Sequence, residues 1–208
     1  MYKILFLDTV TTGMNPEACC IYRLGCIYTE NGQETKRLDL RMRLYNNARI
    51  SEQSLWICGE SRSSLAVYPS QEEAFKTFID FLDSVVDVKN PNDKLFIGGF
   101  NVATFDIPFL RQWFIRNNNE KFRNYFHMQA IDMMIITNNL LLEKRHQCKD
   151  FHLESAARYM GLETLTDNEY DCIQNARTGL RMFRKYREDI YHERFPDNEE
   201  EISCIKNY

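Results

Sequence analysis

Four consecutive apolar residues near the N-terminus, Ile4 to Leu7, lead directly into a carboxylate, Asp8. A short unbroken apolar run is typical of a strand that is buried on both faces of a sheet. In α/β folds such strands carry ligand-binding groups at their carboxyl ends. Side chains two positions apart on a strand point to the same face, so we expect Asp8 and Val10 to project together above that end of the sheet.

Three antiparallel strands are predicted at the start of the chain. Residues 21–28 have strand character, and Asn31-Gly32 is a favourable hairpin turn. Residues 37–44 alternate polar and apolar side chains without a break, as a half-exposed strand does. Together with the first strand, these segments predict an antiparallel beginning for the sheet.

Helices and short strands alternate in the remainder of the chain. Ser70 and Glu73 have the spacing of a capping box at the start of a helix. Residues 95–97 form a short apolar run before two glycines, and a second helix is predicted over 106–115. The last long helix is predicted over 169–186. This order favours an α/β fold with a mixed sheet flanked by helices.

Length and charge define the expected organisation. A chain of 208 residues fits one domain, which we expect over residues 1–190, followed by an acidic C-terminal tail over 191–208. A net charge of -4 disfavours coating of nucleic acid by bulk electrostatics and leaves room for a local basic groove.

We expect no membrane partner, because apolar runs stay well below the roughly 18 residues of a membrane helix. The seven cysteines form no CxxC pair, so a disulfide framework or a zinc site is not expected, and free thiols favour a reducing compartment. With no secretory signal evident, we expect an intracellular, cytoplasmic protein.

The turn from Asp8 to Gly13 resembles the opening motif DxETTG of the DnaQ-like 3'-5' exonucleases, the DEDD superfamily. Every fixed position matches except the glutamate, which Val10 replaces. The resemblance implies a ribonuclease H-like α/β fold and metal-dependent removal of nucleotides from 3' ends. It also implies that Asp8 holds a divalent metal ion, a role that a valine side chain cannot share.

Residues 99–110 resemble the second motif of the same family, in which an Asn and a short spacer precede Phe-Asp. An Asp at a helix start is, on its own, more often a cap. Because this one follows the first motif and a strand with two glycines, we interpret Asp106 as a metal ligand opposite Asp8. The resemblance assigns Asn101 and Phe105 to the substrate, and we interpret Asp132 as a structural or supporting carboxylate.

Residues 169–177 are the best match to the third motif, a His or Tyr followed by an Asp on a late helix. The match aligns Tyr170 with the histidine and Asn175 with the aspartate. A histidine titrates near pH 6.5 and accepts a proton from water, whereas a tyrosine, near pH 10, can only orient the water. Asp171 lies one turn before Asn175, so its carboxylate would be displaced by about 5 Å along the helix.

The expected cofactor follows from the surviving ligands. Two-metal hydrolysis uses two ions about 4 Å apart, and four carboxylates balance their charge. This chain offers Asp8 and Asp106, with Asn175 as a neutral amide. The sequence therefore predicts one Mg²⁺ or Mn²⁺ ion rather than two.

The expected ligand is the 3' end of a single-stranded nucleic acid, DNA rather than RNA. The resemblance assigns the turn Thr11, Thr12 and Gly13 to the terminal nucleotide, and Met14 and Phe105 suit stacking on bases. Five basic residues on the last helix are read equally well as a phosphate-binding stripe or as a solvated face: Arg177, Arg181, Arg184, Lys185 and Arg187. We predict binding of such ends with weak or absent hydrolysis.

Two alternatives stay open at this point. The chain is an active 3'-5' exonuclease, or an inactivated variant of one, if Val10 and Asn175 replace dispensable or deliberately changed groups. It is a scaffold for a protein partner if the cleft carries no net positive potential and binds no oligonucleotide.

Overall fold

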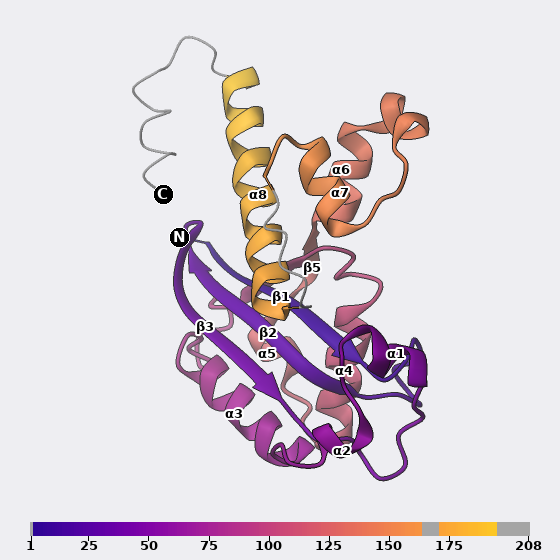
Figure 1. Ribbon diagram of the computed structural model, residues 1–208. Helices are drawn as coiled ribbons and strands as arrows, with labels where there is room; N and C mark the ends of the chain where they lie inside the picture. The colour runs from indigo at the N-terminus through magenta and orange to yellow at the C-terminus, as the bar shows by residue number, and fades with distance from the viewer. Residues whose placement is uncertain (1, 164–170, 195–208) are drawn as a thin grey trace.

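The computed structural model describes residues 2–163 and 171–194 (Figure 1). These residues form a mixed five-stranded sheet in the order β3-β2-β1-β4-β5. Central strand β1 pairs antiparallel with β2 and parallel with β4. The strands are β1 Lys3–Thr11, β2 Ile21–Glu30, β3 Gln33–Arg41, β4 Leu95–Gly99 and β5 Phe126–Asp132.

Helices cover both faces of the sheet. They are α1 Glu52–Ile57, α2 Arg62–Leu65, α3 Gln71–Asp83, α4 Asp106–Arg116, α5 Phe122–Tyr125, α6 Met133–Leu140, α7 Leu153–Tyr159 and α8 Cys172–Arg194, with a 3-10 helix η1 over Leu142–Gln147. None of the helices within the described ranges is both long and apolar enough to cross a bilayer. The predicted α/β fold with an antiparallel start is confirmed.

Element boundaries differ from the prediction in two places. The third strand spans Gln33–Arg41 rather than 37–44, because the turn at Asn31-Gly32, with positive φ at both residues, starts the pairing at once. The last helix begins at Cys172 rather than 169 and continues to Arg194, past the predicted domain boundary at 190. The predicted acidic tail beyond that helix lies outside the described residues.

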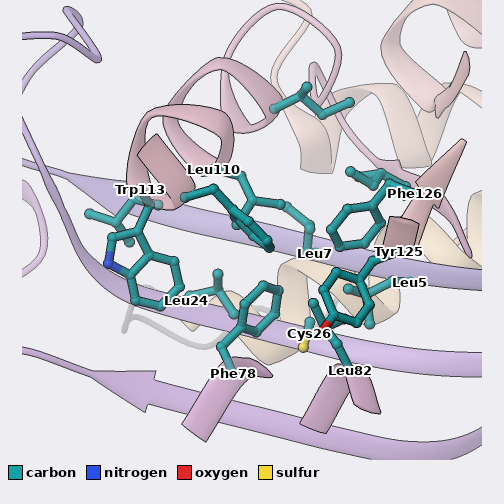
Figure 2. Close-up of a cluster of buried hydrophobic side chains, with 14 of the residues drawn as sticks. Leu5, Leu7, Leu24, Cys26, Phe78, Leu82, Leu110, Trp113, Tyr125 and Phe126 are labelled. Atoms are coloured by element: carbon teal, nitrogen blue, oxygen red, sulfur yellow. The ribbon is translucent and has the colours of Figure 1, made fainter. Parts of the chain in front are cut away.

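Odd-numbered residues of β1 face the layer of α3 and α4. Leu5 and Leu7 pack there among buried side chains from both helices (Figure 2). Phe78 of α3 and Trp113 of α4 meet with ring centroids 5.6 Å apart. The capping box at the start of α3 forms as predicted, with Ser70 and Glu73 bonded reciprocally. This face contains the largest buried cluster.

Even-numbered residues of β1 face α8. Ile4 and Phe6 pack against the helix, and the rings of Phe6 and Phe183 are 5.7 Å apart. Asp8 and Val10 continue the same side of the strand toward the first turn of α8. Strand alternation therefore brings the lone carboxylate of the first motif beneath the last helix.

Gly25 lets the start of α8 lie close to the sheet. Gly25 pairs with Asp8 in the β1–β2 ladder, and a Cβ on Gly25 would lie 2.5 Å from Cys172 Cβ and 2.7 Å from the helix backbone. A Cβ on Gly179, further along α8, would lie 3.5 Å from Gly99 Cα, which is ordinary contact. The first turn of α8 thus approaches β2 more closely than its middle approaches β4.

We expect Gly25→Ala to lower the free energy of unfolding by about 2 kcal/mol, because the added methyl group overpacks the start of α8. Gly179→Ala is the matched control, since its methyl group fits and alanine gains up to about 1 kcal/mol over glycine in a helix. Urea denaturation of both variants measures the difference. An equal loss in the two would contradict the close approach at Gly25.

Candidate active site

Asp8 accepts hydrogen bonds from two neutral groups of α8. The side-chain nitrogen of Asn175, Nδ2, lies 3.2 Å from Asp8 Oδ2. The thiol of buried Cys172 also bonds to Asp8. Burial and the charge of Asp8 raise the pKa of that thiol well above its usual value. The structure therefore brings Asp8 and Asn175 together, with the amide donating to the carboxylate.

Asp106, the first residue of α4, is buried, with 3% of its surface exposed. Its Oδ1 accepts hydrogen bonds from Thr9 N at 2.8 Å and from Thr9 Oγ1 at 2.7 Å. Burial, and next the charge of Asp8, raise the pKa of Asp106 well above its usual value, while the two bonds from Thr9 act in the opposite direction. The two aspartates thus interact across the carboxyl end of β1.

Asp132 supports the loop that leads to Asp106. Its Oδ1 caps α6 by accepting from Met134 N at 2.9 Å, and it also accepts from Asn101 N at 3.0 Å. Its Oδ2 accepts from Ala103 N at 2.9 Å. Because all three donors are backbone groups, Asp132 holds the conformation of the second motif. This agrees with the structural role predicted for it.

Val10 lies in an apolar cluster instead of an ionic one. Its side chain is 7% exposed and packs with buried Tyr22, Leu55, Leu65 and Cys172. A carboxylate at this position would need to leave water for these apolar neighbours, which is costly without a paired cation. The apolar surroundings of position 10 therefore suit the valine that replaces the family's glutamate.

Asp171 has a structural task at the start of α8. Its Oδ1 accepts from Ile173 N at 2.8 Å, which caps the helix. The same oxygen lies 3.5 Å from the guanidinium of Arg23, which also binds Asp39 at 3.1 Å. The cap and the ion pair occupy Asp171, so it does not replace the missing carboxylate at position 175.

The turn after β1 uses its hydroxyl groups internally. Thr11 Oγ1 donates to Gly13 O at 2.7 Å. Thr12 is fully buried, and its hydroxyl donates to Arg49 O at 2.7 Å while accepting from Cys20 N at 3.0 Å. Both hydroxyls therefore stabilise the turn, and the assignment of Thr11, Thr12 and Gly13 to the terminal nucleotide stays a prediction.

The polar and aromatic side chains of the second motif also make contacts within the protein. Asn101 has φ of 60°, a conformation that Asn tolerates, and its side chain bonds to Thr104. Phe105 is partly buried and packs on Phe109, with ring centroids 5.2 Å apart. The backbone of Asn101 is held by Asp132, so neither predicted substrate residue is a freely presented side chain.

Two large apolar side chains near the turn are exposed. Met14 and Trp56 each have 80% of their surface in contact with solvent. The N-cap of α1 is tied to the turn, since Ser51 N donates to Thr12 O at 2.7 Å (Figure 1). The sequence analysis named Met14 as a side chain that suits stacking on bases, and it did not name Trp56. The available signal was its neighbour Leu55, whose burial in a short one-faced helix forces the next residue outward.

Three of the five basic residues of the α8 stripe are bonded within the protein. Arg177 pairs with Glu34 at 3.2 Å, and Arg184 donates to Gly32 O at 2.6 Å. These contacts attach α8 to the β2–β3 hairpin, and Lys185 pairs with its own helix. The structure therefore favours the structural reading of this stripe over phosphate binding.

These contacts do not fit a two-ion centre. Among residues 2–163 and 171–194, no three His, Cys, Asp or Glu side chains are grouped so that they could hold a metal. Thr9 occupies one oxygen of Asp106, and the Asn175 amide occupies one oxygen of Asp8. Val10 contributes no ligand.

Two aspartates at the carboxyl end of a central strand, in a mixed sheet with an antiparallel start, define a DnaQ-like exonuclease fold of the ribonuclease H-like class. The profile of the RNase_T exonuclease family matches residues 5–178. The chain therefore belongs to this exonuclease family, whose enzymes generally depend on divalent metal ions. No curated protein sequence matches the chain.

Solved structures of exonuclease I share the fold. A zinc-bound complex of Escherichia coli exonuclease I with single-stranded DNA is 18% identical, with a TM-score of 0.70, over 91% of this chain and 41% of that one. A complex of the same enzyme with a dT13 oligonucleotide is 16% identical, with a TM-score of 0.71, over 95% and 44%. This chain thus spans less than half the length of these structures.

We expect Asp106→Asn to stabilise the protein increasingly as pH rises. The native state holds the Asp106 proton more tightly than the unfolded chain, so the aspartate costs stability above the unfolded pKa of about 3.9. Asparagine keeps an oxygen for the Thr9 donors and has no charge to bury. Urea denaturation at pH 4 and pH 7 tests this, and a gain independent of pH would contradict it.

Proposed function

We propose that this chain binds single-stranded DNA by its 3' end, in the cleft beside Asp8 and Asp106, and hydrolyses it weakly or not at all. The family provides the ligand class, and the solved exonuclease I complexes contain single-stranded DNA. A single Mg²⁺ or Mn²⁺ ion is the most that the two aspartates support, and binding of the strand does not require it.

The contact between Asn175 and Asp8 carries this proposal. A carboxylate only accepts hydrogen bonds, so the amide must present its NH₂ group to Asp8 and turn its oxygen away. That orientation gives Asp8 a neutral donor where an active centre has a cation. Together with Val10, it lowers the negative charge that would attract a pair of magnesium ions.

Binding needs surfaces that act on a strand without metal. Met14 and Trp56 present apolar and aromatic surface beside the turn, and stacking on an aromatic ring is worth about 1–3 kcal/mol per base. Such stacking tolerates any base sequence. We infer that Trp56 stacks on a base near the 3' end.

Tryptophan fluorescence tests this inference directly. Trp56 is exposed, whereas the second tryptophan, Trp113, is 2% exposed, so quenching by an added oligothymidylate reports on Trp56. We expect Trp56→Ala to weaken binding about tenfold by fluorescence anisotropy. Ile115→Ala, which removes an exposed apolar side chain from α4, is the control and leaves the affinity unchanged.

Absence of oligonucleotide binding by the unchanged chain would contradict the proposed function and favour the protein-scaffold alternative. Equal affinities for the Trp56 variant and the unchanged chain would retain the function and remove Trp56 from the binding surface.

A further inference from the structure

The segment α6–η1–α7, residues 133–159, forms a helical lobe beside the distal half of α8. Figure 1 shows it standing clear of the α3 and α4 layer, on the side of the sheet that α8 covers. Its inner face packs through Met133, Ala156 and Ala157 on the buried side chains between β1 and α8. Its outer face has no role in the site described above.

Positive charge without ion-pair partners lies on this lobe. The stretch 144–149 contains Lys144, Arg145 and Lys149, and it is bounded by the carboxylates Glu143 and Asp150. Within the described part of the chain, none of these three cations makes a salt bridge. The cations of α8, by contrast, are largely paired or bonded to backbone. The lobe therefore presents three neighbouring cations that have no ion pair among the described residues.

Aromatic contacts connect this charge to the cleft. The Arg145 guanidinium lies 4.2 Å from the centroid of the Phe151 ring. Phe151 in turn lies 6.3 Å from the ring of Phe100, which directly precedes Asn101 in the second motif. Asp132, at the base of the lobe, fixes the same loop. A continuous set of contacts thus runs from the loop before Asp106 to the basic stretch.

Side chains that suit nucleobases accompany the cations. Leu142 on η1 and Tyr159 at the end of α7 are exposed. The Tyr159 hydroxyl accepts from Lys149 N at 3.2 Å, which keeps its ring next to the basic stretch. Basic groups interleaved with apolar and aromatic surface are what proteins use to bind single strands without sequence preference.

We propose that the helical lobe binds the 5' continuation of the strand whose 3' end lies in the cleft. Lys144, Arg145 and Lys149 neutralise phosphates there, and Tyr159 contacts a base. This inference rests on the proposed function, because it assumes that a single strand enters the cleft. It adds a second contact region, which only strands long enough to span both regions can reach.

Oligothymidylates of two lengths separate the two contact regions. A strand of about 4 nucleotides fills the cleft alone, and one of about 16 reaches the lobe. The variant K144Q/R145Q/K149Q removes the three cations. K76Q/K89Q/K121Q is the matched control, because it removes the same charge from exposed lysines on other elements, none of them in an ion pair of the described residues. Thermal melting verifies that both variants fold.

We expect the lobe variant to bind the long strand about tenfold more weakly at low salt and the short strand as before. Its slope of log affinity against log salt for the long strand becomes shallower by about 2, from roughly 0.7 for each of three cations on a single strand. The control variant changes neither slope nor length dependence.

Each other outcome has a definite meaning. An unchanged affinity and salt slope for the long strand would overturn the role of the lobe while leaving cleft binding intact. A loss equal for both lengths, or one shared by the control, would also overturn it, since bulk charge would then be responsible. Failure of the unchanged chain to bind either strand would instead overturn the proposed function.

Discussion

The hydrogen bond from Asn175 to Asp8 is the interaction on which the site depends. It joins the first strand to the last helix, and the close approach permitted by Gly25 allows both Asn175 and Cys172 to reach the carboxylate. A neutral amide and a thiol can stabilise one carboxylate in a half-buried position, but they cannot replace the charge of a metal pair. The carboxyl end of β1 therefore keeps Asp8 close to the last helix without the charge of a metal pair beside it.

The substitutions in this site are mutually consistent. Val10 packs into an apolar cluster that would disfavour a glutamate, and the loss of that charge removes one reason to hold a cation. Asp106, which keeps its carboxylate, is bonded by Thr9 and has a raised pKa. Asp171, the acid directly before α8, caps the helix and pairs with Arg23. The neighbours of Val10, Asp106 and Asp171 are thus those expected in a site of low negative charge.

Much of the fold and the central pair of acids could be predicted from the sequence because strand and helix periodicity is local. The alternation of β1, the capping box at Ser70 and the helix start at Asp106 are such signals. The hydrogen bonds of Thr12 and the contacts of the α8 arginines could not be predicted from the sequence. Their partners are distant in the chain: Arg49, Cys20, Glu34 and Gly32. Trp56 was missed for the same reason: its exposure follows from the burial of Leu55 against β1 and β2 residues.

The most direct test of the central claim is trimming of a 5'-labelled single strand with Mg²⁺. The comparison is between this chain and the triple variant Val10→Glu, Tyr170→His, Asn175→Asp. We expect the variant to shorten the strand and the unchanged chain to be at least about a hundredfold slower, which corresponds to about 2.7 kcal/mol in the activation barrier. Adding Asp8→Asn to the triple variant should abolish the reaction, which excludes a contaminating nuclease. Equal rates for the unchanged chain and the triple variant would contradict the account.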